Sequence, residues 1–188
     1  MPRRGSEEER RGALVEAAIK EVGDAGSTDV TVARIARRAG VSSALAHHYF
    51  GTKESILLAA MRRVLTLYGA EVRGALAMAD DGRGRVRAIL VASLLPGSFR
   101  AGTIAAWMAF YASAQHSEEA ARLLGIYQRR LESNLRHALR PHPNAAQVAR
   151  GAAAMIDGIY LREALGPTRA GAREWADLVM EYVEAAAP

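Results

Sequence analysis

The chain of 188 residues contains no cysteine. This absence excludes disulfide bonds, thiolate catalysis, iron–sulfur clusters and cysteine-based zinc sites, and it fits a cytoplasmic protein. Proline is also scarce, and none lies between Pro2 and Pro96. Because proline interrupts helices, this long interval leaves room for several of them. Long alternating runs of β-branched residues, which are typical of strands, are missing too.

Hydrophobic and helix-forming residues are plentiful instead. Half of the residues are hydrophobic and 24% are charged, a balance that excludes a disordered chain. Alanine, the best helix former, occurs 39 times. The composition therefore predicts an all-α fold. The formal net charge of +5 favours an anionic partner without identifying it as nucleic acid.

Capping residues and glycines divide the chain into about nine helices. Ser6 begins a capping-box pattern at the first helix, and Gly26 is placed to end it. Thr31 is a candidate N-cap of the second helix, and Ser42 or Ser43 of the third. The helices are expected at about residues 7–25, 32–39, 43–50, 53–79, 85–95, 101–116, 118–139, 145–165 and 171–187.

The second and third of these helices are separated by a short turn that contains Gly40, which is the helix-turn-helix arrangement. In this arrangement one short helix lies in the major groove of DNA. Ser43, Ala44 and His47 can share one face of the third helix, where small side chains allow close approach and polar ones can bind bases or phosphates. Thr31, at a helix start, can bind a phosphate together with backbone amides.

Other interpretations of these residues remain open. Tyr49 and Phe50 are as compatible with a hydrophobic core as with DNA contact. His47 and His48 can be a solvated pair, because no third ligand has a spacing suited to a metal site. No metal site is therefore expected.

The residue order from Thr31 to Glu54 resembles the signature of the TetR family of transcriptional regulators. It reads TVARIARRAGVS from Thr31 and HYFGTKE from His48, within a match that covers about residues 10–60. The resemblance implies a DNA-binding domain at residues 1–52 and a ligand-binding and dimerisation domain at 53–188. It also implies phosphate contacts by Thr31, Tyr49 and Lys53 and base contacts by Ser43, Ala44 and His47. The full predicted DNA-binding set is Thr31, Ser42, Ser43, Ala44, His47, His48, Tyr49 and Lys53.

Three segments of the second domain resemble a subfamily, the choline-responsive BetI repressors of glycine betaine synthesis. They are WMAFY from Trp107, GIYQRRLESNL from Gly125 and MIDGIYLR from Met155. The resemblance implies a repressor that binds double-stranded operator DNA as a homodimer and responds to choline. An effector of another kind, such as a drug, a fatty acid or a polyamine, is the alternative.

The chemistry of these segments suits a quaternary ammonium ion. Such an ion has no hydrogen to donate, so proteins hold it on aromatic faces, at times beside a carboxylate. Each ring can equally be part of the core, and Asp157 can pair with a ligand cation or with an internal arginine such as Arg129 or Arg162. The predicted ligand-binding set is Trp107, Phe110, Tyr111, Tyr127, Asn134, Asp157 and Tyr160.

The last two expected helices carry the predicted dimer interface. Small residues allow helices to approach closely, and an apolar stripe gives them a surface to bury. A two-fold dimer would set two reading helices about one DNA turn, or a multiple of it, apart. The residues concerned are Gly151, Ala152, Ala153, Ala154, Gly158 and Leu161, followed by Trp175, Leu178, Val179, Tyr182 and Val183.

Other classes of protein are less well supported. The sequence has no G-x-S-x-G, H-E-x-x-H or P-loop motif, so neither an enzyme nor a bound cofactor is expected. A scaffold protein that has lost DNA binding is disfavoured by the intact basic helix-turn-helix. The segment at residues 101–117 has no formal charge, but it is too short and too polar for a membrane span.

Overall fold

The computed structural model describes residues 6–94, 101–166 and 171–187, and within these ranges the chain forms nine helices and no strand. The all-α prediction is confirmed. The predicted end of the fifth helix at residue 95 lies outside the described residues. The helices are α1 (Glu7–Ala25), α2 (Val32–Arg38), α3 (Ser43–Phe50), α4 (Lys53–Ala77), α5 (Gly82–Leu94), α6 (Ala101–Ser113), α7 (Glu118–Ala138), α8 (Ala145–Leu165) and α9 (Ala172–Ala186).

Helix α1 starts with the predicted capping box. The Ser6 hydroxyl accepts a hydrogen bond from the Glu9 amide at 3.2 Å, and the Glu9 carboxylate accepts one from the Ser6 amide at 2.6 Å. These two bonds satisfy amide groups that a helix start leaves unpaired. At the other end, Gly26 has a φ of 61°, a left-handed conformation that glycine adopts without steric cost.

Two helix boundaries differ by three residues from those expected. Helix α5 starts three residues early, at Gly82, because an Asp81 carboxylate oxygen accepts the Gly84 amide at 2.6 Å and acts as a cap. Helix α6 ends at Ser113 rather than at residue 116. The amides of Gln115 and His116 bond to carbonyls only three residues back, which tightens the turn beyond α-helical geometry.

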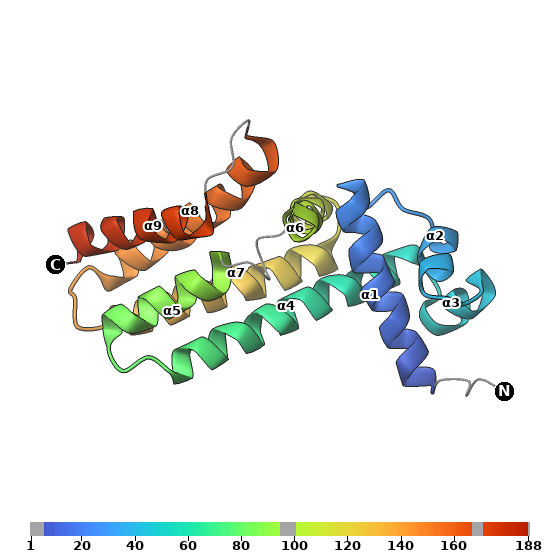
Figure 1. Ribbon diagram of the computed structural model, residues 1–188, viewed down its shortest axis with the longest axis horizontal. Coiled ribbons are helices and arrows are strands. Elements are labelled where there is room, and N and C mark those ends of the chain that lie inside the picture. Colours follow the sequence, from blue (N-terminus) through green and yellow to red (C-terminus); the bar gives the residue numbers. More distant parts are fainter. Residues whose placement is uncertain (1–5, 95–100, 167–170, 188) are drawn as a thin grey trace.

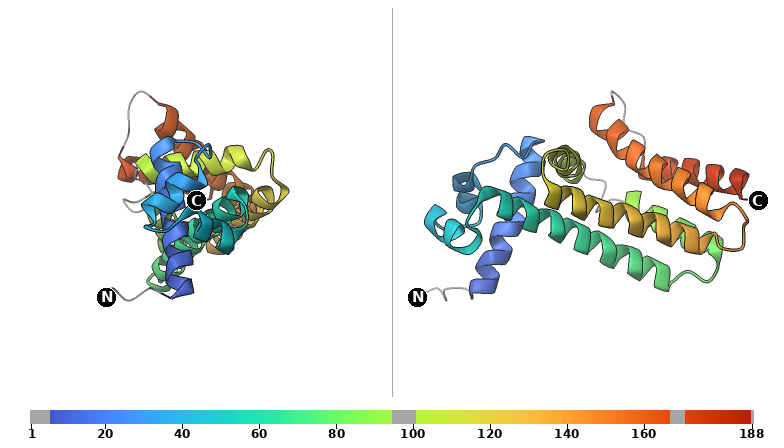
Figure 2. Two further views of the ribbon diagram at one scale, coloured as in Figure 1. Left: turned by 90° about the vertical axis from the view of Figure 1, so that its right-hand side faces the viewer. Right: turned by 180° about the vertical axis from the view of Figure 1, so that it is seen from behind.

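The nine helices form an elongated molecule with two parts (Figure 1). Helices α1, α2 and α3 lie together at one end, and α5, α7, α8 and α9 lie toward the other. Helix α4 runs from the first part along the second, and the right-hand view of Figure 2 shows it as one continuous rod. Helix α6 crosses between the two parts and packs against α1.

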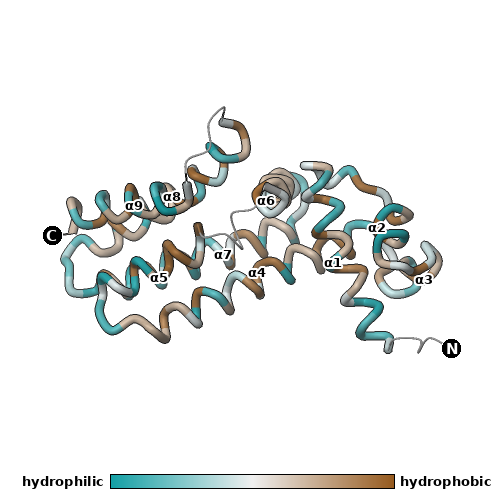
Figure 3. The backbone as a smooth tube through the Cα atoms, viewed as in Figure 1, coloured by the Kyte–Doolittle hydropathy of each residue, from teal (hydrophilic) through white to brown (hydrophobic). Residues whose placement is uncertain are grey.

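Each part has its own hydrophobic core. The N-terminal core takes Leu14, Val22 and Ile35 from α1 and α2, whereas the C-terminal core is built mainly from α5, α7, α8 and α9. Helix α4 contributes to both, with Ile56 in the first core and Val72 in the second. Figure 3 shows hydrophobic positions recurring along α4 and α5, while the start of α1 is hydrophilic. A change in the C-terminal part can therefore be transmitted to the N-terminal part through α4.

None of the helices in the described part of the chain is long and apolar enough to cross a lipid bilayer. The uncharged helix α6 is buried within the protein instead, with Ile104, Ala106 and Trp107 each at most 3% exposed.

Candidate functional site

The predicted DNA-binding residues gather on α3 and on the starts of α2 and α4. Lys53 is the first residue of α4 and is partly buried, and Tyr49 is only 9% exposed. The other six are exposed, so they form an accessible surface at the end of the molecule that holds α2 and α3 (Figure 1). These six are Thr31, Ser42, Ser43, Ala44, His47 and His48.

The hydroxyl groups of Thr31 and Ser42 on this surface cap helices. Thr31 caps α2 by accepting the Arg34 amide at 3.2 Å, and Ser42 caps α3 by accepting the Leu45 amide at 3.2 Å. Each hydroxyl therefore keeps its own hydrogen for donation, which suits a phosphate oxygen.

His47 has a fixed ring orientation. Its Nδ1 lies 3.0 Å from the carbonyl oxygen of Gly51. Because a carbonyl can only accept, Nδ1 carries the hydrogen, and in the neutral ring Nε2 becomes an acceptor. An exposed acceptor on a reading helix can take a hydrogen bond from an exocyclic amine of adenine or cytosine. Within the described residues, no group of three His, Asp or Glu side chains could hold a metal ion.

Tyr49 joins α3 to α1. Its hydroxyl accepts a hydrogen bond from Arg10 Nε at 2.8 Å, and its carbonyl accepts one from the Arg11 guanidinium at 2.7 Å. The Arg11 guanidinium also lies 4.7 Å from the centre of the Phe50 ring. Arg10 and Arg11 thus bring positive charge beside the reading helix. Sequence reasoning missed them because they lie some 40 positions away from α3 and carry no motif.

A buried carboxylate fixes α2 against α1. Glu21 is 4% exposed and contacts Arg38 Nε at 2.6 Å and an Arg34 nitrogen at 2.8 Å. The hydrogen bond from Arg38 is the main reason that the pKa of Glu21 is lowered. Since breaking a buried ion pair leaves a charge unpaired, this contact holds the helix-turn-helix in one orientation.

Four aromatic rings from α6, α7 and α8 meet in the C-terminal part. The Trp107 ring centre lies 4.9 Å from that of Tyr127, 6.1 Å from that of Tyr111 and 6.0 Å from that of Tyr160. We call Trp107, Tyr111, Tyr127 and Tyr160 the aromatic cluster. The structure therefore brings together residues that three separate sequence segments supply.

Asp157 places one negative charge at the aromatic cluster. Its Oδ1 accepts hydrogen bonds from the hydroxyls of Tyr111 at 2.8 Å and Tyr127 at 3.3 Å. Burial raises the pKa of Asp157, and these hydrogen bonds lower it in part. Within the described residues no Arg or Lys nitrogen lies within 4 Å of this carboxylate, so neither Arg129 nor Arg162 is its partner there.

The tyrosines of the cluster are held in their neutral form. Burial, reinforced by the charge of Asp157, raises the pKa of Tyr111 and of Tyr160. Burial also raises the pKa of the neighbouring Tyr68 to about 12, and its hydroxyl lies 2.9 Å from that of Ser93. The Tyr160 hydroxyl donates to the Ser93 carbonyl. All these hydroxyls therefore remain donors, and the rings present neutral faces.

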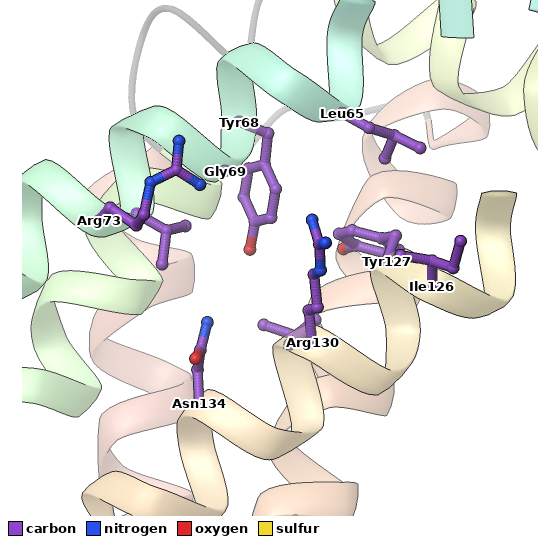
Figure 4. A pocket seen from close by; sticks show the side chains of 10 residues that line it. Leu65, Tyr68, Gly69, Arg73, Ile126, Tyr127, Arg130 and Asn134 are labelled. Carbon is purple, nitrogen blue, oxygen red and sulfur yellow. The ribbon is translucent and has the colours of Figure 1, made fainter. Parts of the chain in front are cut away.

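Two predicted ligand residues lie apart from the cluster. Phe110 is 2% exposed and belongs to the N-terminal core. Asn134 lines a cavity of about 330 Å³ between α4 and α7 (Figure 4). Tyr127 belongs to both the cluster and the cavity wall. The cavity is lined by Leu65, Tyr68, Gly69, Val72, Arg73, Ile126, Tyr127, Arg130, Leu131 and Asn134.

The predicted dimer stripe divides into two sets. Val179 and Val183 are buried in the C-terminal core, whereas Leu161 and Leu178 are 50% and 44% exposed. Leu165, close to the end of α8, is 76% exposed. These three leucines form an exposed apolar face on α8 and α9 that no other described residue covers.

The remaining residues of the predicted stripe pack α8 and α9 tightly together. A Cβ atom at Gly151 would lie 2.0 Å from the Tyr182 hydroxyl, so only glycine leaves room for that ring. The Trp175 indole donates to the buried Glu163 carboxylate at 2.6 Å. Tyr182 and Trp175 thus hold the two helices together within one chain.

The chain matches known regulators along most of its length. Residues 14–60 match the family described as bacterial regulatory proteins, tetR family, and residues 82–188 match the BetI-type transcriptional repressor C-terminal family. The chain is 47% identical over 186 residues to the HTH-type transcriptional regulator BetI of Brucella anthropi, covering 97% of this chain and 96% of that protein. It is 47% identical over 188 residues to BetI of Rhizobium meliloti, covering 98% and 93%.

Solved structures share the fold at lower identity. A transcriptional regulator from Pseudomonas aeruginosa PAO1 has a TM-score of 0.84 and 24% identity, covering 97% of this chain and 92% of that one. A regulator from Saccharomonospora viridis, solved in complex with choline, has a TM-score of 0.86 and 20% identity, covering 94% and 96%. At these identities the likeness shows a common fold.

Proposed function

The chain belongs to the TetR family of transcriptional regulators and has the BetI-type repressor C-terminal domain, and from this premise we propose that choline releases it from its operator. In the proposal a homodimer binds double-stranded operator DNA in the cytoplasm and represses genes of glycine betaine synthesis. Choline binding in the C-terminal part lowers the affinity for DNA. Such release requires that choline bind more tightly to a conformation in which the two DNA-binding domains no longer fit the operator. A ligand with equal affinity for both conformations would not change their populations.

One observation carries the choice of effector, namely the carboxylate of Asp157 at the aromatic cluster, which has no Arg or Lys partner among the described residues. A buried charge without a counter-ion is unfavourable, and a ligand cation relieves that cost. A trimethylammonium group needs aromatic faces rather than acceptors, and Trp107 and Tyr127 supply such faces beside the carboxylate. The choline complex of the S. viridis regulator, which has the same fold, supports this choice.

The DNA-binding roles are part of the same proposal. Lys53, at the first turn of α4, meets a phosphate together with the backbone amides of that turn. His47 offers Nε2 to a base edge, and Ser43 lies exposed on the same helix. Tyr49 acts mainly by holding α3 against α1, because its hydroxyl is already bonded to Arg10.

The proposal is tested by calorimetric titration with choline and by gel shift on the operator. Trp107→Leu removes an aromatic face and retains an apolar side chain, so we expect choline affinity to fall about tenfold or more. Phe110→Leu is the matched control: it changes another buried aromatic residue of α6 that lies in the N-terminal core. This control should keep the choline affinity of the original protein.

In the gel shift, choline should release the original protein at lower concentrations than it releases the Trp107→Leu variant. Absence of choline binding at millimolar concentration would reject choline as the effector. A parallel titration with spermidine then tests a polyamine, since a polyamine ammonium group can also pair with Asp157. Equal losses in both α6 variants would place the site outside the aromatic cluster.

A further inference from the structure

The cavity between α4 and α7 carries positive charge that the proposed function does not use. Arg73 from α4 and Arg130 from α7 line it, and none of the lining residues described above is acidic. Within the described part of the chain, neither arginine has an ion-pair partner. Between residues 126 and 140 the sequence has four arginines and a single glutamate, so the α7 side of this cavity is positive.

The same cavity is apolar on its inner walls. Leu65 and Val72 from α4 face Leu131 from α7 across it, and the Tyr127 ring closes one side. Figure 4 shows the Asn134 side chain pointing into the space between the two helices and the Arg130 side chain rising between the rings of Tyr68 and Tyr127. The cavity thus has an apolar interior with hydrogen-bond donors near its opening.

From this arrangement we infer that the cavity binds a small carboxylate with a compact apolar body. A guanidinium group pairs with a carboxylate through two parallel hydrogen bonds, and the Asn134 amide can donate a further one. The volume of about 330 Å³ lies at the lower end of the range for small-molecule sites. Arg73 and Arg130 stand on different helices, so a bound carboxylate would connect α4 to α7.

This site is distinct from the aromatic cluster although both use Tyr127. The cluster has the negative charge of Asp157, which repels a carboxylate, while the cavity has two arginines, which repel a quaternary ammonium ion. The two sites therefore select ligands of opposite charge on either side of one ring. The inference does not depend on choline being the effector.

The test is calorimetric titration of the full-length protein with 3,3-dimethylbutyrate and with 3,3-dimethylbutan-1-ol. The two probes share the same branched apolar body, and only the first has a carboxylate. We expect the acid to bind at least about tenfold more tightly than the alcohol, because a hydrogen-bonded charge pair contributes that much. Arg130→Gln should abolish most of this difference, while its choline affinity stays unchanged.

Arg129→Gln is the matched control. Arg129 is an equally exposed neighbour on α7 but does not line the cavity, so its replacement should leave the affinity for the acid unchanged. Equal binding of the acid and the alcohol, or no binding of the acid at millimolar concentration, would overturn the inference. So would equal losses in the Arg129→Gln and Arg130→Gln variants, which would indicate attraction to the basic surface as a whole.

Discussion

A single side chain, Asp157, determines much of the electrostatics of the proposed effector site. Its pKa is raised by burial, so the folded state holds this proton at a pH where the unfolded chain has released it. The contribution of Asp157 to stability is therefore greatest at low pH and declines as the pH rises through the raised pKa. Where Asp157 is ionised, the ligand-free protein keeps an unfavourable buried charge, which a bound cation would offset.

We predict that Asp157→Asn weakens choline binding without weakening the fold. The amide oxygen can still accept the hydrogen bonds of Tyr111 and Tyr127, while the cost of burying a charge disappears. At pH 7 the free energy of unfolding should be unchanged or higher, and choline affinity should fall at least about tenfold. Urea denaturation and calorimetry measure the two effects. Asp177→Asn, at an exposed position of α9, should change neither strongly.

The same carboxylate predicts a pH dependence of binding. As the pH falls through the raised pKa of Asp157, the carboxyl group becomes neutral and the affinity for choline should decline. The decline should begin at a higher pH than for an ordinary carboxyl group. Titrations from pH 7 downward should show it in the original protein and not in the Asp157→Asn variant. A flat profile in the original protein would remove Asp157 from the site.

At the scale of elements, helix α4 and the α1–α6 contact connect the two parts of the molecule. Helix α4 has residues in both cores, and α6 supplies Trp107 to the C-terminal core and Phe110 to the N-terminal core. The contact between α1 and α6 is close because glycines stand on both sides. A Cβ atom on Gly23 would lie 2.5 Å from the carbonyl oxygen of Gly102. A movement of α6 is therefore passed to α1 by direct backbone contact.

We predict opposite effects for two glycine substitutions in α1. Gly12→Ala meets no neighbouring atom within 4 Å and should raise the free energy of unfolding by up to about 1 kcal/mol through helix propensity. Gly23→Ala gains the same propensity but forces α6 away from α1, and we expect a net loss of about 1–3 kcal/mol. Urea denaturation of both variants gives the comparison. Equal stabilisation by the two substitutions would show that the α1–α6 contact is loose.

The first turn of α4 carries the prediction for DNA affinity. Lys53→Ala removes one phosphate contact, so binding should weaken similarly on all DNA sequences, and the slope of log K against log salt should fall by about one unit. Arg140→Ala, beyond the end of α7, removes a cation far from the reading helix and should leave the slope unchanged. Equal slopes for the original protein and the Lys53→Ala variant would contradict the assignment.

Local features of the fold could be predicted from the sequence, whereas contacts between distant segments could not. The N-caps at Ser6, Thr31 and Ser42 were predictable because a cap depends on residues three positions apart. The start of α5 was predicted three residues late, at residue 85, because the Asp81 cap was not recognised.

The effector site shows the same limit. Trp107 and Asp157 were predicted for this site because they lie in recognisable segments. Tyr68 and Arg73 line the neighbouring cavity but belong to α4, where no motif marks them. Phe110 follows Trp107 by three positions on α6 and yet lies in the other core. Sequence spacing gives the helical face, but only the packing of α6 between two cores decides which neighbour each ring meets.

At the scale of the whole molecule, α2 and α3 lie at one end, and α8 and α9 belong to the C-terminal part (Figure 1). The outward leucines stand on α8 and α9. Pairing of two chains through α8 and α9 would bury these leucines and leave both reading helices free. The elongated shape then sets the distance between the two reading helices, which must suit the spacing of two operator half-sites.

We predict that Leu161→Asp combined with Leu178→Asp gives folded monomers that no longer bind the operator specifically. Both leucines are about half exposed in the single chain, so charges there should spare the core, while in a dimer they would be buried unpaired. Sedimentation velocity should show the change in mass. A monomer has one DNA-binding domain and loses the gain in affinity that comes from binding two half-sites at once. The gel shift should therefore show only weak, salt-sensitive binding. Leu67→Asp, at a 41% exposed leucine of α4, is the matched control and should remain dimeric. Persistent dimers in the double variant would place the interface elsewhere than on α8 and α9.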